Sequence, residues 1–333
     1  MKLLASIDQI EDPEIAAVRD RLYQLDPTGE RIARVIRDTY DQLYDGQRTG
    51  HWHFSQLSKT EKTHMGTLIE INLQREFKFD DGDATDYRIA GVQVDCKYSM
   101  RPGGWALPPE IINHLALLIW ANDDTATWTA GLVRVDGKIM NLALNRDRKG
   151  TLSALGRTKI MRLWPDHGRL APNLFISLDP ATRASIFNAQ ENGQPSSGQA
   201  RVNELFRRVQ QRIIRRAEIA TVAQQEDFMK RARENGGARS KLRPEGILIL
   251  GHMENEPVIA DQLGLPAPKS GELISVRVKP TDQSSDDKMA AIGTSFWTIA
   301  KTTDSIQEAP SVPKKSAQAA INMLRAHDEM NQK

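Results

Sequence analysis

The stretch "TDYRIAGVQVDCKYS", Thr85 to Ser99, alternates apolar and polar side chains on both sides of Ala90-Gly91. Alternation with a period of two is typical of β-strands, and a two-residue turn that contains glycine joins two strands into a hairpin. If Ile89 pairs with Val92, the register places Arg88 opposite Gln93, Tyr87 opposite Val94 and Asp86 opposite Asp95. We therefore predict an antiparallel hairpin in which two carboxylates face each other.

A cation bound between Asp86 and Asp95 would explain why two acids face each other. Their Cβ atoms would lie about 5 Å apart, and like charges placed opposite each other destabilise a sheet unless a cation lies between them. A hard divalent cation with oxygen ligands is the natural candidate. The alternative without a catalytic role is that Asp95 and Lys97 are part of a solvated strand face.

The alternation of side chains along a strand also predicts which face of the sheet each neighbouring side chain occupies. Asp95 and Lys97 share one face, while Cys96 points to the opposite, buried face. An ammonium beside a metal-bound carboxylate can orient or deprotonate an attacking water, and the metal stabilises charge on a phosphoryl group. The hairpin thus predicts a phosphodiester hydrolase site.

Helical patterns precede the hairpin and strand patterns follow it. Apolar residues recur at helical spacing over residues 30–46, which places Leu43 in the core, and over His64 to Phe77. Further strands are predicted near His114 to Ala121 and Thr127 to Val135. Helices followed by consecutive strands indicate a mixed α/β fold.

Length and composition exclude several classes of protein. A chain of 333 residues suits two domains, and its single cysteine excludes an intrachain disulfide and a cysteine-based zinc cage. We find no apolar run of membrane-spanning length, no secretory signal pattern, no GxGxxG and no Walker motif. We expect a cytoplasmic protein without a nucleotide cofactor.

The second half has a different pattern. "LWPDHGRLAPN", Leu163 to Asn173, is typical of a linker, so we expect domains at residues 1–165 and 166–310, with a tail at 311–333. A short strand is predicted over Asn173 to Asp179, one helix over Ala200 to Ile219 and another over Glu226 to Glu234. A basic turn then leads into an apolar strand. This order is typical of a winged helix-turn-helix.

Charge is concentrated in the same region. Gln199 to Arg243 contains twelve Lys or Arg and five Asp or Glu, a net +7, whereas the whole chain carries +2. A solvated face is one interpretation, and contact with DNA phosphates is the one we favour. Arg239, Lys241 and Arg243 are the predicted DNA contacts. Arg101 belongs to a Gly- and Pro-rich loop that is either a weaker candidate or an ordinary connection.

Two further motifs have ordinary explanations. "LYDG", Leu43 to Gly46, is similar to the Lys-x-Asp-Gly of DNA ligases but lacks the lysine that forms a lysyl-adenylate, so we predict no ligation. "HWH", His51 to His53, could chelate a metal, but packing of the loop on Trp52 is the interpretation we favour.

Asp86, followed nine positions later by Asp95-Cys96-Lys97, resembles the catalytic motif of the PD-(D/E)XK nucleases. Longer blocks resemble the NaeI restriction endonuclease family, which is type IIE: "QLYDGQRTG", "KTEKTHMGTLIEINLQREF", "GQARVNELFRRV" and "IATVAQQEDFMKRAR". The resemblance implies a restriction-endonuclease-like α/β core domain followed by a CAP-like winged helix-turn-helix domain. Thr85 stands where the motif usually has proline, and we expect little consequence.

The resemblance also implies residue roles. Asp86 and Asp95 would bind Mg²⁺, with the main-chain carbonyl of Cys96 as a further ligand, and Lys97 would position the water. Glu70, from the preceding helix, would be an additional catalytic acid.

The remaining implications concern DNA. The resemblance implies a homodimer that cuts a GC-rich palindrome such as GCCGGC, activated by a second DNA copy on the C-terminal domain. One competing hypothesis is a DNA-binding regulator with an inactive nuclease fold, and the intact Asp86, Asp95 and Lys97 argue against it. Another is a strand-joining enzyme, which would need a covalent phosphoryl acceptor.

Overall fold

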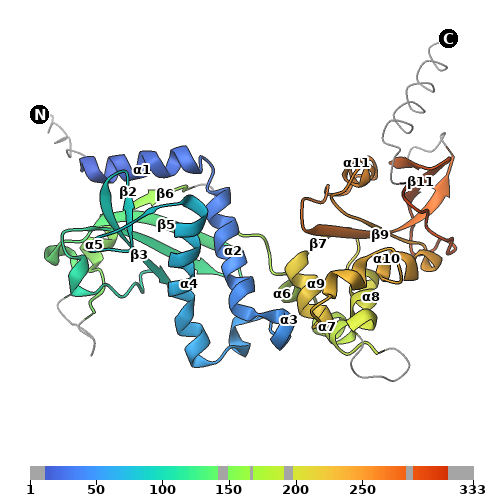
Figure 1. Ribbon diagram of the computed structural model, residues 1–333, viewed down its shortest axis with the longest axis horizontal. Helices are drawn as coiled ribbons and strands as arrows, with labels where there is room; N and C mark the ends of the chain where they lie inside the picture. Colours follow the sequence, from blue (N-terminus) through green and yellow to red (C-terminus); the bar gives the residue numbers. More distant parts are fainter. Residues whose placement is uncertain (1–11, 142–148, 166–167, 191–197, 283–287, 314–333) are drawn as a thin grey trace, which may run out of the picture. The chain divides into compact units, whose positions relative to one another are not determined.

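The computed structural model describes residues 12–141, 149–165, 168–190, 198–282 and 288–313 (Figure 1). The chain forms two compact units, one of residues 1–44 with 53–173 and the other of residues 45–52 with 174–333. The polypeptide therefore passes between the units after Tyr44, after Trp52 and after Asn173. The N-terminal domain boundary expected at residue 165 differs from this division.

Main-chain hydrogen bonds join residues 168–173 to the first unit. Trp128 N–H donates to the Gly168 carbonyl over 3.0 Å, and Leu170 N–H donates to the Ala126 carbonyl over 2.9 Å. The segment predicted to be a linker is thus paired with the start of a strand in the N-terminal unit.

The N-terminal unit is built on a six-stranded sheet with the order β1-β2-β3-β4-β5-β6. Among the described strands of this sheet, β3 and β4 pair in parallel and the other neighbours are antiparallel. The strands are β1 (Asp80–Asp81), β2 (Tyr87–Ile89), β3 (Val92–Ser99), β4 (Leu115–Asn122), β5 (Thr127–Arg134) and β6 (Met161–Leu163).

The hairpin predicted from the sequence is confirmed. Ile89 pairs with Val92, Arg88 with Gln93 and Tyr87 with Val94. Ala90 and Gly91 have φ values of 51° and 79°, the left-handed conformation that a tight hairpin turn of this kind requires. Strand β2 begins at Tyr87, so Asp86 lies just before the paired residues, and the predicted Asp86–Asp95 pair is not part of the observed register.

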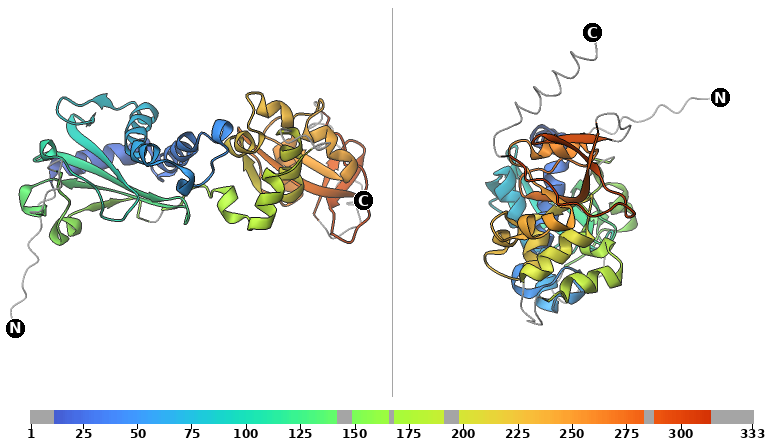
Figure 2. Two further views of the ribbon diagram at one scale, coloured as in Figure 1. Left: turned by 90° about the horizontal axis from the view of Figure 1, so that it is seen from below. Right: turned by 90° about the vertical axis from the view of Figure 1, so that its right-hand side faces the viewer.

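Helices cover one face of this sheet (Figures 1 and 2). They are α1 (Pro13–Leu25), α2 (Glu30–Tyr44) and α4 (Lys59–Phe77). The apolar stripe of α2, which includes Ile36, Tyr40 and Leu43, is buried together with Ile69 and Leu73 of α4. Leu43 is 7% exposed, so its predicted place in the core is confirmed.

Shorter elements accompany this sheet. The 3-10 helices are η1 (Phe54–Gln56), η2 (Pro109–Ile111) and η3 (Gly137–Ile139), and α5 spans Ala154–Thr158. A second apolar cluster, which includes Trp105, Ile111 and Leu152, packs with Ala116 and Leu118 of β4. Strand β4 is therefore covered on both faces.

The C-terminal unit combines short helices with a second sheet. Its helices are α3 (Gly46–Thr49), α6 (Leu174–Ser177), α7 (Pro180–Phe187), α8 (Gly198–Arg208), α9 (Arg216–Ala223), η4 (Phe228–Ala232), α10 (Ala238–Lys241), η5 (Arg243–Glu245) and α11 (Glu256–Gln262). Its strands are β7 (Ile213–Arg215), β8 (Ile247–Leu250), β9 (Glu272–Thr281), β10 (Met289–Ile292) and β11 (Ser295–Ile299). Strand β9 pairs with β7, β8 and β11.

Several predictions for this unit were wrong. The strand predicted over Asn173 to Asp179 is helix α6. The helix predicted over Ala200 to Ile219 is divided into α8, β7 and α9, because Gln211 has φ 60° and Ile213 and Ile214 pair with β9. The helix predicted over Glu226 to Glu234 is the shorter 3-10 helix η4.

The expected tail also differs at its start. Ala309 is 1% exposed, and its N–H donates to the Arg243 carbonyl over 2.9 Å. Ser311 Oγ donates to Oε1 of Glu234 over 3.1 Å, and Val312 packs against an apolar cluster of the C-terminal unit, so the chain is still docked there where an exposed tail was expected to begin. Residues 314–333 of the predicted tail lie outside the described residues. In the ranges that the structure describes, no helix has both the length and the apolar character needed to cross a membrane.

Candidate active site

Strand β3 and the residue before β2 bring the predicted catalytic groups together. Cys96 is 4% exposed and packs in the same core as helices α2 and α4. Asp95 and Lys97 pair in register with Ala116 and Leu118, which belong to the cluster on the other face of the sheet. The predicted alternation of side chains along β3 is confirmed.

The ammonium group of Lys97 lies among three oxygens. Its Nζ is 2.5 Å from Oδ2 of Asp95, 2.9 Å from the Cys96 carbonyl oxygen and 3.4 Å from Oδ2 of Asp86. The same Asp86 oxygen accepts a hydrogen bond of 2.7 Å from the Cys96 N–H. Asp86 is therefore fastened to β3 by a main-chain bond although it lies outside the strand pairing.

Burial and mutual repulsion change the acidity of these groups. Burial raises the pKa of Asp95 to about 6, because the nearby charge of Asp86 adds to desolvation and the ammonium of Lys97 offsets them only in part. Burial alone would lower the pKa of Lys97, but its bond to Asp95 and the charges of both aspartates raise it. Lys97 is thus a stable cation between two acids.

Glu70 belongs to the same electrostatic cluster. It lies on α4, and its main-chain carbonyl accepts a hydrogen bond of 2.6 Å from the Tyr87 hydroxyl. Burial raises the pKa of the Glu70 carboxyl, and the charge of Asp86 raises it further. Helix α4 therefore brings its acid near Asp86.

The donor set fits a hard cation. A positive charge already lies among two carboxylate oxygens and one carbonyl oxygen, which are the ligand types that Mg²⁺ and Ca²⁺ take. Among the described residues, no three His, Cys, Asp or Glu side chains form a metal-binding group. The main-chain carbonyl of Cys96 is the third oxygen around the Lys97 ammonium.

The Cys96 thiol is unsuited to nucleophilic chemistry. Burial raises its pKa to about 12, so the thiol stays protonated at neutral pH. Burial raises the pKa of the neighbouring Tyr87 hydroxyl as well.

The predicted DNA contacts lie on both units. Arg101 is exposed in the loop after β3. Arg239 forms a double ion pair with Glu256 over 2.6 and 2.8 Å, and Arg243 contacts Glu308 over 2.9 Å. Lys241, at the end of α10, is exposed. Arg239 and Arg243 therefore have carboxylate partners within the protein.

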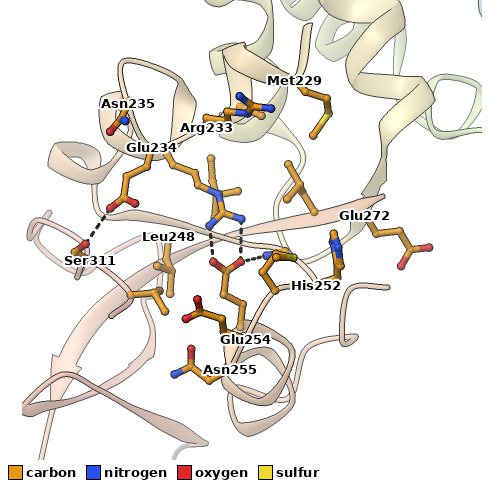
Figure 3. A pocket seen from close by; sticks show the side chains of 18 of the residues that line it. Met229, Arg233, Glu234, Asn235, Leu248, His252, Glu254, Asn255, Glu272 and Ser311 are labelled. Carbon is orange, nitrogen blue, oxygen red and sulfur yellow. Dashed lines mark hydrogen bonds and ion pairs between the residues drawn. The ribbon is translucent and has the colours of Figure 1, made fainter. Parts of the chain in front are cut away.

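A cavity of about 1060 Å³ in the C-terminal unit lies beside these residues (Figure 3). Its lining includes Arg239 and Arg243 together with exposed cations that sequence reasoning did not select: Arg216, Lys230 and Arg233. All three belong to the basic block of the sequence. The sequence did not single them out, because composition does not distinguish basic residues that form ion pairs from those that face solvent.

The "HWH" segment packs as a loop. The Trp52 ring lies 6.2 Å from that of Phe175 and 4.4 Å from the Arg183 guanidinium. His53 bonds to Ser55 and to Asp124. The predicted packing on Trp52 is confirmed.

Comparison with known proteins identifies the class of enzyme. The family described as restriction endonuclease NaeI matches residues 16–308. The chain is 57% identical over 307 residues to the type II restriction enzyme NaeI of Lentzea aerocolonigenes, which covers 92% of this chain and 96% of that relative. The protein is a type II restriction endonuclease, a site-specific deoxyribonuclease. It belongs to the NaeI restriction endonuclease family.

Proposed function

We propose that this chain cuts double-stranded DNA with Mg²⁺ held by Asp86, Asp95 and the Cys96 carbonyl. The observation that carries the proposal is the convergence of these three oxygens on the Lys97 ammonium. When bound, the metal would polarise the scissile phosphate and lower the pKa of a coordinated water.

The protein's own groups have separate tasks. Lys97, once displaced from between the aspartates, orients the attacking water and donates to the phosphate oxygen. The Cys96 N–H donates to Oδ2 of Asp86 and so holds this carboxylate beside the strand. Glu70 supplies an additional carboxylate beside Asp86 to accept a proton from water.

The C-terminal unit supports binding of a second DNA copy. Along the chain α8, β7, α9, α10, β8 and β9 occur in this order, with η4, η5 and α11 inserted among them, and β9 lies between β7 and β8 in the sheet. A winged helix has the same order of helices and strands. The exposed side chains of Lys230, Arg233 and Lys241 supply positive charge for phosphate contacts.

The oligomeric state and the recognition sequence are proposed from the resemblance to the family. We propose a homodimer, because two-fold symmetry matches a palindrome, and a GC-rich site such as GCCGGC. Activation by a DNA copy on the C-terminal unit completes the proposal, and the double role of DNA makes this a type IIE enzyme.

The test is a digest of supercoiled plasmid with Mg²⁺ or with EDTA, with and without a short duplex that contains GCCGGC. We expect metal-dependent double-strand breaks that the duplex accelerates, and sequencing of the ends gives the site. Binding without cleavage under every condition would instead support a DNA-binding regulator with an inactive nuclease fold.

A further inference from the structure

The turn between β4 and β5 carries two consecutive acids, Asp123 and Asp124. Asp123 is 5% exposed, and its Oδ2 accepts hydrogen bonds from the Tyr44 hydroxyl over 2.6 Å and from the Asn173 amide over 2.9 Å. The chain passes between the units three times. Tyr44 is the last residue before the first passage, and Asn173 is the last residue before the third. One carboxylate oxygen thus holds the residues at two of the passages.

The neighbouring acid holds the remaining passage. Oδ1 of Asp124 lies 2.8 Å from Nε2 of His53, the first residue of the N-terminal unit after the second passage. Each of the three passages therefore has a residue bonded to this one turn, although Tyr44, His53 and Asn173 come from distant parts of the sequence.

A buried cation fixes Asp123 in place. Its Oδ1 forms an ion pair with Arg37, which is 2% exposed and lies 2.9 Å from Oδ1 of Asp41. Burial would lower the pKa of Arg37, but the charges of Asp41 and Asp123 raise it. Breaking a buried pair leaves an uncompensated charge, so this arrangement is held firmly.

The cluster continues to the catalytic strand. The Arg37 guanidinium lies 5.2 Å from the centre of the Tyr40 ring, and the Tyr40 hydroxyl bonds to that of Tyr98 over 2.8 Å. Tyr98 follows Lys97 in β3. A continuous series of contacts therefore leads from the passages to the strand that carries the candidate active site.

We propose that Asp123 is a positioning residue that couples the C-terminal unit to the active site. Displacement of the chain at Tyr44 or Asn173, when DNA binds the C-terminal unit, changes the hold on Asp123 and is transmitted through Arg37 and Tyr40 to Tyr98. The inference rests on the proposed activation by a second DNA copy. The test measures the coupling itself.

The main variant is the double substitution Tyr44→Phe with Asn173→Ala in the full chain. It removes both bonds from the passages to Asp123 but leaves the buried Arg37 pair intact. Tyr98→Phe removes the last contact of the series. Tyr23→Phe is the matched control, because it deletes a hydroxyl that accepts a bond of 3.0 Å from the Trp164 N–H elsewhere in the same unit.

The primary readout is the ratio of cleavage rates with and without the activating duplex. The double variant and Tyr98→Phe should each lower this ratio about tenfold, within the range typical of allosteric coupling. The affinity for the duplex and the unstimulated rate should match those of Tyr23→Phe. A structural role alone would lower the melting temperature and leave the ratio unchanged, which would overturn the proposal.

Hydrogen exchange distinguishes the proposal from the function on which it rests. Amides of residues 45–53 should exchange faster in the double variant than in Tyr23→Phe, and equal exchange would show that Asp123 does not hold the passages. If the unsubstituted protein shows no stimulation, the proposed activation fails and the coupling to the active site is overturned with it. If stimulation is present in the unsubstituted protein and unchanged in the variants, only the role of Asp123 fails.

Discussion

The Lys97 ammonium lies 2.5 Å from Oδ2 of Asp95 and 2.9 Å from the carbonyl oxygen of the residue between them. A divalent cation coordinated by the same oxygens would need that space and would repel the ammonium. We therefore expect Lys97 to take two positions. In one it lies between the aspartates and neutralises them, and in the other it lies beside the reacting water. Binding of the metal and release of the lysine are expected to be one event.

Lys97→Met should separate these two roles. Loss of the ammonium removes a competitor for the oxygens of Asp86 and Asp95, so Ca²⁺ binding measured by calorimetry should tighten. Cleavage in Mg²⁺ should fall by about 10²–10⁴-fold, the usual contribution of a group that handles a proton. Lys138→Met, on an exposed residue of the same unit, should change neither measurement. Unaltered Ca²⁺ affinity in Lys97→Met would show that the ammonium and the metal use different places.

Metal binding should depend on pH through Asp95. Its pKa of about 6 lies above the ordinary value of aspartate, so protons compete with the cation as the pH falls through 6. Calorimetric titration with Ca²⁺ should show weaker binding below pH 6. Asp95→Asn should abolish cleavage, retain DNA binding and remove this pH dependence.

The same shift predicts how stability changes with pH. The folded-state pKa of Asp95 is raised above its unfolded value, so the folded state binds the proton more tightly. The contribution of protonated Asp95 to stability is complete below the unfolded pKa and is lost as the pH rises through about 6. Without metal, Asp95→Asn should therefore lose less stability than the unsubstituted protein between pH 4 and pH 7, as followed by thermal unfolding.

Cys96→Ser should keep most of the cleavage activity. The carbonyl of residue 96 is unaffected by the change, and the thiol is buried with a pKa of about 12. The new hydroxyl is more polar than the thiol and should cost about 1–3 kcal/mol of stability if it finds no full set of partners. Rate measurements at a temperature well below the melting point separate the two effects. A folded Cys96→Ser protein without activity would contradict the assignment of a main-chain role.

Gly46→Ala should destabilise the C-terminal unit. A Cβ on Gly46 would lie 2.1 Å from Oγ1 of Thr221 and 2.8 Å from the His51 carbonyl, so α3 could no longer pack as it does on α9. Overpacking of this kind costs about 1–3 kcal/mol. Gly66→Ala is the control, because a Cβ there meets nothing within 4 Å and alanine stabilises a helix interior by about 1 kcal/mol. Calorimetry should show opposite shifts for the two variants.

Arg233→Ala should weaken duplex binding by the C-terminal unit. Arg233 is exposed on the lining of the cavity, and each lost phosphate contact should reduce the slope of log affinity against log salt by about 0.9. Arg239→Ala should act differently, because it leaves Glu256 without its bidentate partner and should lower stability by about 1–3 kcal/mol. If Arg239→Ala changed the salt slope without changing stability, its ion pair would be secondary to DNA contact.

The parts of the fold that depend on neighbouring residues could be predicted from the sequence. The hairpin of β2 and β3 needs only alternation and a two-residue turn, so its register and the inward side chain of Cys96 followed directly. Helix α2 was visible in its apolar spacing. The convergence of Asp86, Asp95 and Lys97 is a consequence of the same local geometry.

The remaining parts depend on partners that are distant in sequence. Strand β7 resembles the helices beside it and becomes a strand only because Ile213 and Ile214 pair with β9. The Arg239–Glu256 pair and the bonds of Asp123 to Tyr44 and Asn173 likewise join separate segments. A single sequence shows that such charged residues exist but does not show which of them meet.

The eight residues of 45–52 belong to the C-terminal unit although most of that unit begins at residue 174. Neither unit is therefore one continuous stretch of its gene. A fragment expressed from residue 174 onward would lack α3 and leave the side of α9 around Thr221 without its packing partner. A self-sufficient C-terminal fragment would have to carry residues 45–52 on a designed linker, and a transplant of this unit into another enzyme would require two insertions.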